Sequence, residues 1–143
     1  RPLLYIGNGC RNHEDLMSVK SFIETVGIPF ALSWSAADLF PSDHPLNVGR
    51  IGIYGDRATN IALQKSDLLL CIGTRLAIPQ IGYDRADFGR RATKWVVEID
   101  PSECSKFADT DWNMLTISPR NFFTRIRTVG LRKYEGQMHE SCL

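Results

Sequence analysis

Asp67-Leu68-Leu69-Leu70-Cys71-Ile72-Gly73-Thr74-Arg75 is the stretch that decides the fold. It opens on an acid and ends in a glycine, a hydroxyl and an arginine. Its apolar residues do not alternate with polar ones, which is expected of a strand in a parallel sheet that helices cover on both faces. Loops at the carboxyl ends of such strands bind ligands in doubly wound sheets. A functional site is therefore expected at this exit.

Composition is that of an ordinary globular chain. Its 143 residues suit one domain with its own core, and 43% hydrophobic with 23% charged residues is typical of such domains. A formal net charge of +1 supplies no field for binding nucleic acid or an anionic membrane surface. No apolar run approaches the roughly 20 residues of a membrane-spanning helix. We therefore expect no nucleic-acid partner and no membrane partner.

The four cysteines are scattered along the chain. Cys10, Cys71, Cys104 and Cys142 lack the close spacing of zinc or redox motifs. Cys71 falls inside the predicted buried strand, so we expect reduced cysteines and a cytoplasmic location. The first residue is Arg1, and strand-like residues begin almost at once. We interpret this start as a piece cut from a longer chain.

Hydrophobic patterns alternate between strands and helices. After the first strand, Asn12 can cap a helix and Gly27 can end it. Ser118 and Pro119 open a last helix in the usual way. The alternation predicts an α/β fold of three layers, with helices on both faces of a parallel sheet. Strands are expected at residues 2–6, 28–34, 67–75, 94–100 and 114–117, with a long irregular connection over residues 35–55.

The first predicted strand ends in Gly7-x-Gly9-x-x-Asn12, two thirds of a dinucleotide-binding fingerprint. Glycines let the backbone approach a phosphate, and the amino end of the following helix attracts its charge. The third glycine of the fingerprint is absent. A plain tight turn is therefore as consistent with the pattern as a phosphate contact.

Two acids and one arginine stand at other strand ends. Glu98 and Asp100 are placed where an acid accepts hydrogen bonds from ribose hydroxyls. Capping of the next helix, or pairing with a nearby base, explains these acids equally well. Arg75 follows Gly73 and Thr74, and we interpret its planar guanidinium as a phosphate clamp rather than as the partner of an acid.

No group in the sequence is recognisable as catalytic. His13, His44 and His139 are isolated, and no serine or cysteine has a partner visible in the sequence. We interpret His44, between Asp43 and Pro45, as a turn residue, with Asp43 and His44 as an acid and base pair the less favoured alternative. We predict no catalytic residue and no metal ligand in this chain.

An ordered set of short motifs resembles the central domain of thiamine-diphosphate-dependent enzymes of the acetolactate synthase type. The match keeps the family's order and spacing from about residue 1 to residue 129. The motifs are Ile6-Gly7-Asn8-Gly9-Cys10, Gly27-Ile28-Pro29-Phe30, Phe40-Pro41-Ser42-Asp43-His44-Pro45-Leu46-Asn47-Val48-Gly49, Ile53-Tyr54-Gly55, Ser66-Asp67-Leu68-Leu69-Leu70-Cys71-Ile72-Gly73-Thr74-Arg75-Leu76 and Val97-Glu98-Ile99-Asp100-Pro101-Ser102-Glu103.

The resemblance implies a Rossmann-like, DHS-like domain with a six-stranded parallel sheet. In the family this domain lies between one that binds the pyrimidine of thiamine diphosphate and one that binds its diphosphate with Mg²⁺. No Gly-Asp-Gly followed by paired asparagines, the signature of the latter, occurs here. The chain is thus similar to the scaffold part of a 2-oxo acid decarboxylase or carboligase, inert alone, whose parent is a homodimer or homotetramer.

Relatives of this type hold FAD, as in acetolactate synthase, or ADP, as in oxalyl-CoA decarboxylase, in the central domain, and in others the domain is empty. By this resemblance, the two glycines lie beside the phosphates and the serine loop runs along the nucleotide. The Gly-x-Arg segment clamps the nucleotide, and the two acids lie near the ribose. The sequence departs from the family pattern at two places. Ile117-Ser118 stands before the last helix where the family often has Gly-Asp, and the segment after Arg75 lacks the Phe-Asp-Asp-Arg of the flavin-binding synthases. The cofactor-binding residues implied by position are Gly7, Gly9, Ser33, Trp34, Ser35, Gly73, Thr74, Arg75, Glu98 and Asp100.

The residues alone leave one alternative of a different class, a free-standing flavin- or nicotinamide-nucleotide-binding module. The same glycines, arginine and acids motivate it. For either function we expect one domain over residues 1–130 and a linker or tail over residues 131–143.

Overall fold

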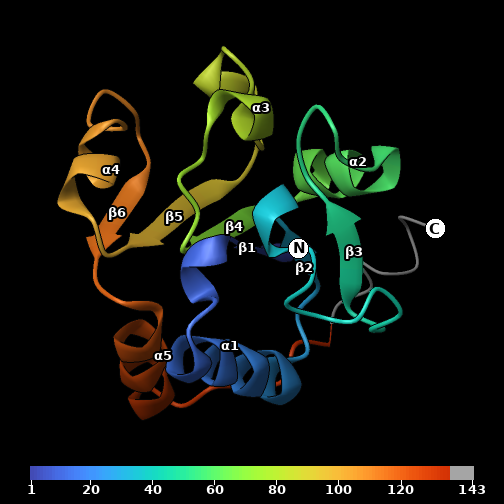
Figure 1. The fold of residues 1–143 in the computed structure, drawn as a ribbon, viewed down its shortest axis with the longest axis vertical. Coiled ribbons are helices and arrows are strands. Elements are labelled where there is room, and N and C mark those ends of the chain that lie inside the picture. The colour runs from blue at the N-terminus through green and yellow to red at the C-terminus, as the bar shows by residue number, and fades with distance from the viewer. Residues whose placement is uncertain (136–143) are drawn as a thin grey trace.

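Six parallel strands form the central sheet of the computed structural model, which describes residues 1–135 (Figure 1). Every neighbouring pair is parallel, as the alternating pattern predicted. Their order is β3-β2-β1-β4-β5-β6, so the order reverses between the two central strands. The strands are β1 (Pro2–Ile6), β2 (Phe30–Leu32), β3 (Asn47–Arg50), β4 (Leu68–Ile72), β5 (Thr93–Glu98) and β6 (Asn113–Thr116).

Helices cover both faces of this sheet, which confirms the three-layer α/β fold. Figure 1 shows α1 and α5 side by side on one face, with α2 and α3 on the other. Three short 3₁₀ turns follow strand ends or join loops. The helices are α1 (His13–Val26), α2 (Arg57–Lys65), α3 (Ile78–Ile81), α4 (Pro101–Ser105) and α5 (Pro119–Thr128), and the turns are η1 (Asn8–Cys10), η2 (Trp34–Ala36) and η3 (Arg85–Asp87).

The predicted caps of α1 are confirmed. The side chain of Asn12 accepts a hydrogen bond from the backbone N–H of Asp15 at 2.9 Å, which satisfies one of the free amides of the first turn. Gly27 ends the helix with φ of 73°, a left-handed conformation that glycine adopts without a steric penalty. The start and the end of α1 are therefore determined locally.

Side chains of β1 alternate between two cores. Leu4 and Ile6 face α1 and α5, where the rings of Phe22 and Phe123 lie 4.7 Å apart. Tyr5 faces the opposite core, under α2. Burial of each such side chain contributes roughly 1.5–3 kcal/mol, so the strand is held from both sides.

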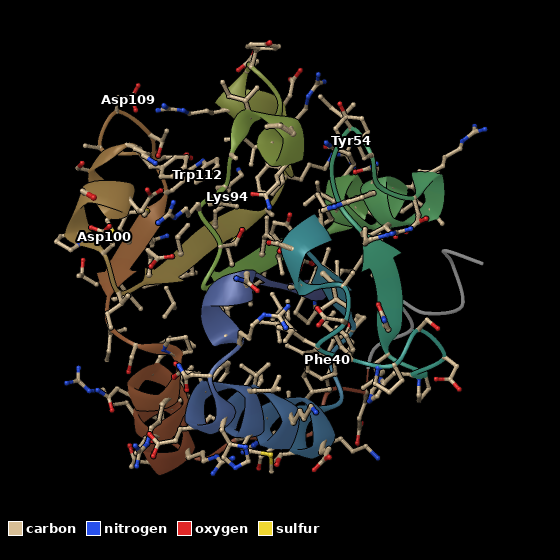
Figure 2. The ribbon with its side chains drawn as sticks, viewed as in Figure 1. Phe40, Tyr54, Lys94, Asp100, Asp109 and Trp112 are labelled. Atoms are coloured by element: carbon tan, nitrogen blue, oxygen red, sulfur yellow. The ribbon has the colours of Figure 1, made fainter. Side chains whose placement is uncertain are left out.

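The second core also buries a charge. Lys94, on β5, is buried beneath the indole ring of Trp112, with its Nζ 5.6 Å from the ring centroid (Figure 2). Its Nζ donates a hydrogen bond to the carbonyl oxygen of Ala92 at 3.2 Å. These contacts compensate for part of the cost of removing the ammonium from water.

Several strands differ from the sequence-based expectation, and those predicted over residues 28–34 and 67–75 are shorter, Phe30–Leu32 and Leu68–Ile72. Residues 35–55 were predicted to be an irregular connection, whereas Asn47–Arg50 forms edge strand β3. It pairs with β2 through a register shift, and its residues are all only partly buried. The strand predicted over residues 94–100 ends at Glu98, two residues early, because Asp100 and Pro101 start a helix instead.

The end of the chain is partly described. Leu131 and Tyr134 pack against the core beside α1, and the Tyr134 N–H donates to the carbonyl oxygen of Val26 at 2.6 Å. The rest of the predicted linker or tail, residues 136–143, lies outside the described residues, together with His139 and Cys142. Within residues 1–135, no helix is long and apolar enough to cross a membrane.

Candidate functional site

A pocket of about 500 Å³ lies at the carboxyl ends of the central strands, where the strand order reverses. Chains leaving neighbouring strands in opposite directions create a crevice at this point in doubly wound sheets. The pocket is lined by residues of the loops after β1, β2, β4 and β5. They are Asn8, Gly9, Ser33, Ser35, Gly73, Thr74, Arg75, Ala77, Gln80 and Glu98.

The glycines after β1 bring two loops into backbone contact. The N–H of Gly9 donates to the carbonyl oxygen of Gly73 at 2.8 Å. A Cβ on Gly7 would lie 2.5 Å from the Cα and Cβ of Thr74, and closer still to the Gly73 carbonyl oxygen. A Cβ on Gly9 would lie 2.9 Å from the Gly73 Cα. These glycines therefore permit the close approach of the two loops, and Gly7 lies below the pocket rather than in its lining.

The amino end of α1 does not line this pocket. Asn12 caps it, and the carboxylate of Asp15 accepts a hydrogen bond from the backbone N–H of Arg120 in α5 at 2.7 Å. The 3₁₀ turn η1 separates the glycines from the helix. Any anion in the pocket would therefore meet loop groups and side chains instead of the α1 dipole, unlike the fingerprint geometry considered from the sequence.

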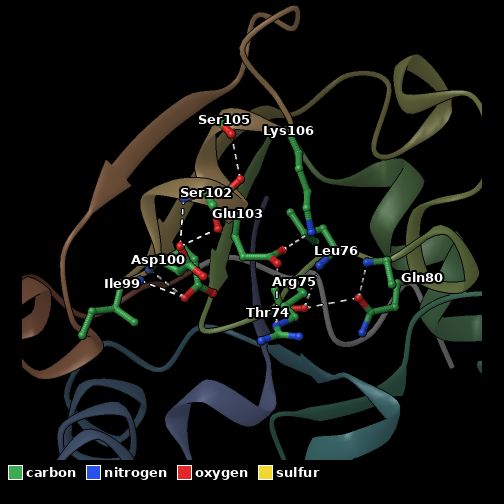
Figure 3. Close-up of polar contacts among 12 residues, drawn as sticks. Thr74, Arg75, Leu76, Gln80, Ile99, Asp100, Ser102, Glu103, Ser105 and Lys106 are labelled. Atoms are coloured by element: carbon green, nitrogen blue, oxygen red, sulfur yellow. Dashed lines mark hydrogen bonds and ion pairs between the residues drawn. The ribbon is translucent and has the colours of Figure 1, made fainter.

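The loop after β4 holds an exposed cation at the pocket mouth. The Arg75 side chain is 78% exposed, and its Nε lies 3.9 Å from the Glu103 carboxylate, a weak contact (Figure 3). Gly73 and Leu76, on either side, have left-handed φ angles of 57° and 50°. For leucine this conformation costs roughly 1–2 kcal/mol, which the burial of its side chain offsets. The loop thus turns Arg75 outward while Leu76 stays in the core.

The two acids after β5 have different roles. Glu98 lines the pocket, and its Oε1 accepts hydrogen bonds from the N–H groups of Ile99 at 2.9 Å and Asp100 at 3.3 Å. Asp100 caps α4, because its Oδ1 accepts from the Ser102 N–H at 2.9 Å and hydroxyl at 2.7 Å (Figure 3). The hydrogen bond from the Ser102 side chain is the main cause that lowers the pKa of Asp100. Capping, one of the two alternatives left open, thus describes Asp100.

The loop after β2 presents two hydroxyls. Ser33 and Ser35 line the pocket, and their Oγ atoms lie 3.4 Å apart. Trp34, between them, is 65% exposed. The Arg50 guanidinium lies 5.5 Å from the centroid of the Trp34 ring, and the ring centroids of Trp34 and Tyr54 are 6.2 Å apart. Of the ten residues singled out by the resemblance, seven line the pocket, and Gly7, Trp34 and Asp100 do not.

Arg11 links the loops after β1 and β2 by hydrogen bonds. The sequence did not indicate this role. Its Nε donates to Asn8 Oδ1 at 2.6 Å and its Nη2 donates to the Ser35 carbonyl oxygen at 3.0 Å. It also forms a two-pronged ion pair with Asp38 at 2.6 and 2.9 Å, which lowers the pKa of that carboxyl to about 2. Because these partners are far apart in the chain, only the position of Arg11 beside the glycine turn could have hinted at this role.

The lining residues Asn8, Ala77 and Gln80 were also missed. Gln80 lies in α3, a single turn that the mixed pattern after Arg75 does not resolve. His44 is a turn residue as interpreted, since its Nδ1 accepts from the Leu46 N–H at 3.2 Å and its ring packs on Phe30 at 5.1 Å.

The sequence matches one known protein family over most of its length. The model of the thiamine pyrophosphate enzyme central domain matches residues 1–121. The chain belongs to this family. The strand-end motifs from which the resemblance was drawn lie inside the matched range, and a free-standing flavin or nicotinamide module is not favoured.

Curated relatives of this chain include acetolactate synthases of plants and bacteria. Acetolactate synthase 1 of Zea mays is 38% identical over 106 residues, or 74% of this chain. The acetolactate synthase of Mycobacterium bovis is 34% identical over 111 residues, or 78% of the chain, and isozyme 1 of Escherichia coli, large subunit, is 35% identical over 106 residues, or 74%. The matched segment covers only 16% of the maize protein and 18% of each bacterial one. The chain therefore spans a small part of the curated relatives that it matches.

Proposed function

We propose that this central domain serves a thiamine-diphosphate- and Mg²⁺-dependent 2-oxo acid decarboxylase or carboligase, and that its pocket binds the adenosine diphosphate moiety of ADP or FAD. The chain itself contributes scaffold and nucleotide binding without catalysing the reaction. Support comes from one observation above all, the polar pocket at the reversal of strand order in a member of this family.

The described residues offer no cluster of side chains for the metal that accompanies thiamine diphosphate. Within residues 1–135, no group of three or more His, Cys, Asp or Glu side chains could hold a metal ion. We therefore assign thiamine diphosphate and Mg²⁺ to flanking domains of the same parent chain. When bound there, thiamine diphosphate supplies the nucleophilic carbon for decarboxylation of a 2-oxo acid. This domain supplies position and rigidity.

The pocket residues do suit an adenosine diphosphate group. Arg75, at the end of β4, offers a guanidinium that pairs with phosphate oxygens. Glu98, at the end of β5, offers carboxylate oxygens to ribose hydroxyls. The hydroxyls of Ser33 and Ser35 add groups that both donate and accept. A cation and an anion on neighbouring strand ends match the diphosphate and the ribose of one nucleotide.

Thermal unfolding with added nucleotide tests the pocket. A ligand at 100 times its Kd stabilises the folded state by roughly 2.7 kcal/mol, which corresponds to roughly 10 °C in Tm for a domain of this size. We expect this shift with ADP or FAD, and a smaller shift for Arg75→Gln. An unchanged Tm with both nucleotides would contradict nucleotide binding.

The parent activity needs its own experiment. The full-length gene product should consume pyruvate or another 2-oxo acid when thiamine diphosphate and Mg²⁺ are supplied. If the intact protein binds no thiamine diphosphate, the proposed activity is wrong. Both outcomes are independent of what occupies the pocket of the central domain.

The partners and limits of the domain are also proposals. We propose that the domain ends near residue 130, that it contacts the flanking domains of its own chain, and that the parent forms a homodimer or homotetramer. Light scattering of the full-length protein measures that state. Cys10, Cys71 and Cys104 are free and buried, which supports a reducing, cytoplasmic location.

A further inference from the structure

The side-chain amide of Gln80 makes hydrogen bonds to the protein through its oxygen but not through its nitrogen. Its Oε1 accepts a hydrogen bond from the backbone N–H of Ala77 at 2.9 Å and a longer one from the Thr74 hydroxyl at 3.4 Å (Figure 3). A backbone N–H can only donate, so the atom that it meets must be the amide oxygen. The two contacts therefore fix which way the amide faces.

With the oxygen so held, Nε2 carries two N–H donors that are available to an acceptor. Among residues 1–135, no atom accepts a hydrogen bond from Gln80 Nε2. Gln80 is partly buried and lines the same pocket as Arg75. The lining of the pocket thus contains both an oriented donor and a guanidinium.

We propose that Gln80 is a specificity-determining residue, which donates through Nε2 to a phosphoryl oxygen of the nucleotide beside Arg75. The inference rests on the proposed nucleotide binding and deepens it. Because a donor next to a cation favours an anionic oxygen, the pair should select phosphorylated nucleotides over the bare nucleoside. Glu98, on the next strand end, is an acceptor and so suits the ribose side of the ligand.

Gln80→Glu separates this role from a purely structural one. The glutamate has nearly the same shape and keeps an oxygen for Ala77 and Thr74, so the loop remains anchored. The donor becomes a carboxylate oxygen, which repels phosphate. We expect the Tm without ligand to change by no more than about 2 °C, as for a substitution that breaks no internal contact.

Calorimetric titration of the 143-residue chain with ADP and with adenosine at pH 7.5 measures the selectivity. Loss of one charge-assisted hydrogen bond should weaken ADP binding roughly 10- to 100-fold in Gln80→Glu. Adenosine, which lacks the phosphates, should bind both proteins within about twofold, because nothing that it contacts has changed. Asn121→Asp, an equal change of charge on exposed α5, should leave ADP binding unchanged.

Each outcome is decisive. If the wild-type chain binds neither ADP nor FAD, the proposed nucleotide binding is wrong and the inference fails with it. If the wild-type chain binds ADP and Gln80→Glu binds it equally well, the pocket stands and the role of Gln80 is refuted. If Gln80→Glu loses ADP and adenosine alike, with a marked fall in Tm, then Gln80 only supports the loop and the inference is again refuted.

Discussion

Replacing Gly7 with alanine should separate the two loops that form the floor of the pocket. The added Cβ would lie 2.5 Å from the Cα and Cβ of Thr74 and closer still to the Gly73 carbonyl oxygen, whereas ordinary contact begins at 3.4 Å, so the loops must move apart by at least about 0.9 Å. Alanine tolerates the φ of −105° at this position, so backbone strain adds nothing. Overpacking against backbone atoms that cannot rotate away should cost about 3 kcal/mol.

Gly9→Ala provides the graded comparison. Its Cβ would lie 2.9 Å from the Gly73 Cα, which requires a shift of about half an ångström, so we expect a smaller loss of about 1 kcal/mol. Urea unfolding of both variants measures the difference. Gly130→Ala, where a Cβ has open space but φ is 82°, controls for the general cost of replacing a glycine, about 1–2 kcal/mol in a left-handed conformation. Equal stability of Gly7→Ala and Gly9→Ala would refute this account of the loop contact.

Three further results are expected. Asn12→Ala should lower the free energy of unfolding by about 1 kcal/mol in urea, because the Asp15 N–H loses its cap, and Asn12→Ser should restore most of it. Tyr5→Phe should raise that free energy by up to about 1 kcal/mol, since the buried Tyr5 hydroxyl has no hydrogen-bond partner in the described part of the chain, and a loss of stability would contradict this. Burial, more than the nearby carboxylates, raises the pKa of the Cys10 thiol to about 12, so the folded state keeps a proton that the unfolded chain releases above its ordinary pKa of 9.0. Stability should therefore hold below pH 9 and fall as the pH rises toward 12, and Cys10→Ala should show a shallower fall in alkaline denaturation curves.

The elements that could be predicted are those whose signals are local. The buried strand before Gly73 and the capped helix after Asn12 follow from apolar runs and end residues, and both are present. Edge strand β3 has no such signal, because Asn47–Arg50 contains one apolar residue and a glycine with φ of 103°. It is held by groups distant in sequence, including the Thr59 hydroxyl, which donates to the Val48 carbonyl oxygen. Only the resemblance supplied the sixth strand.

The location of the site could be predicted from the sequence, but the contacts of its side chains could not. Parallel strands direct their carboxyl ends to one edge, so loops containing Gly9, Gly73 and Glu98 had to meet. Which side chains turn inward depends on contacts that sequence spacing does not show. Asp100 caps the helix that begins at Pro101, and the Trp34 ring packs against the Arg50 guanidinium instead of lining the pocket.

The backbone contact between the loops after β1 and β4 makes the crevice a property of the assembled sheet. Asn8 and Gly9 contribute to one wall and residues 73–75 to the other, with more than sixty positions of chain between them. A chain cleaved in the turn at residues 41–46 would leave each fragment with one of the two walls. Recovery of ligand uptake would then report that β1 and β2 of the first fragment had inserted again between β3 and β4 of the second.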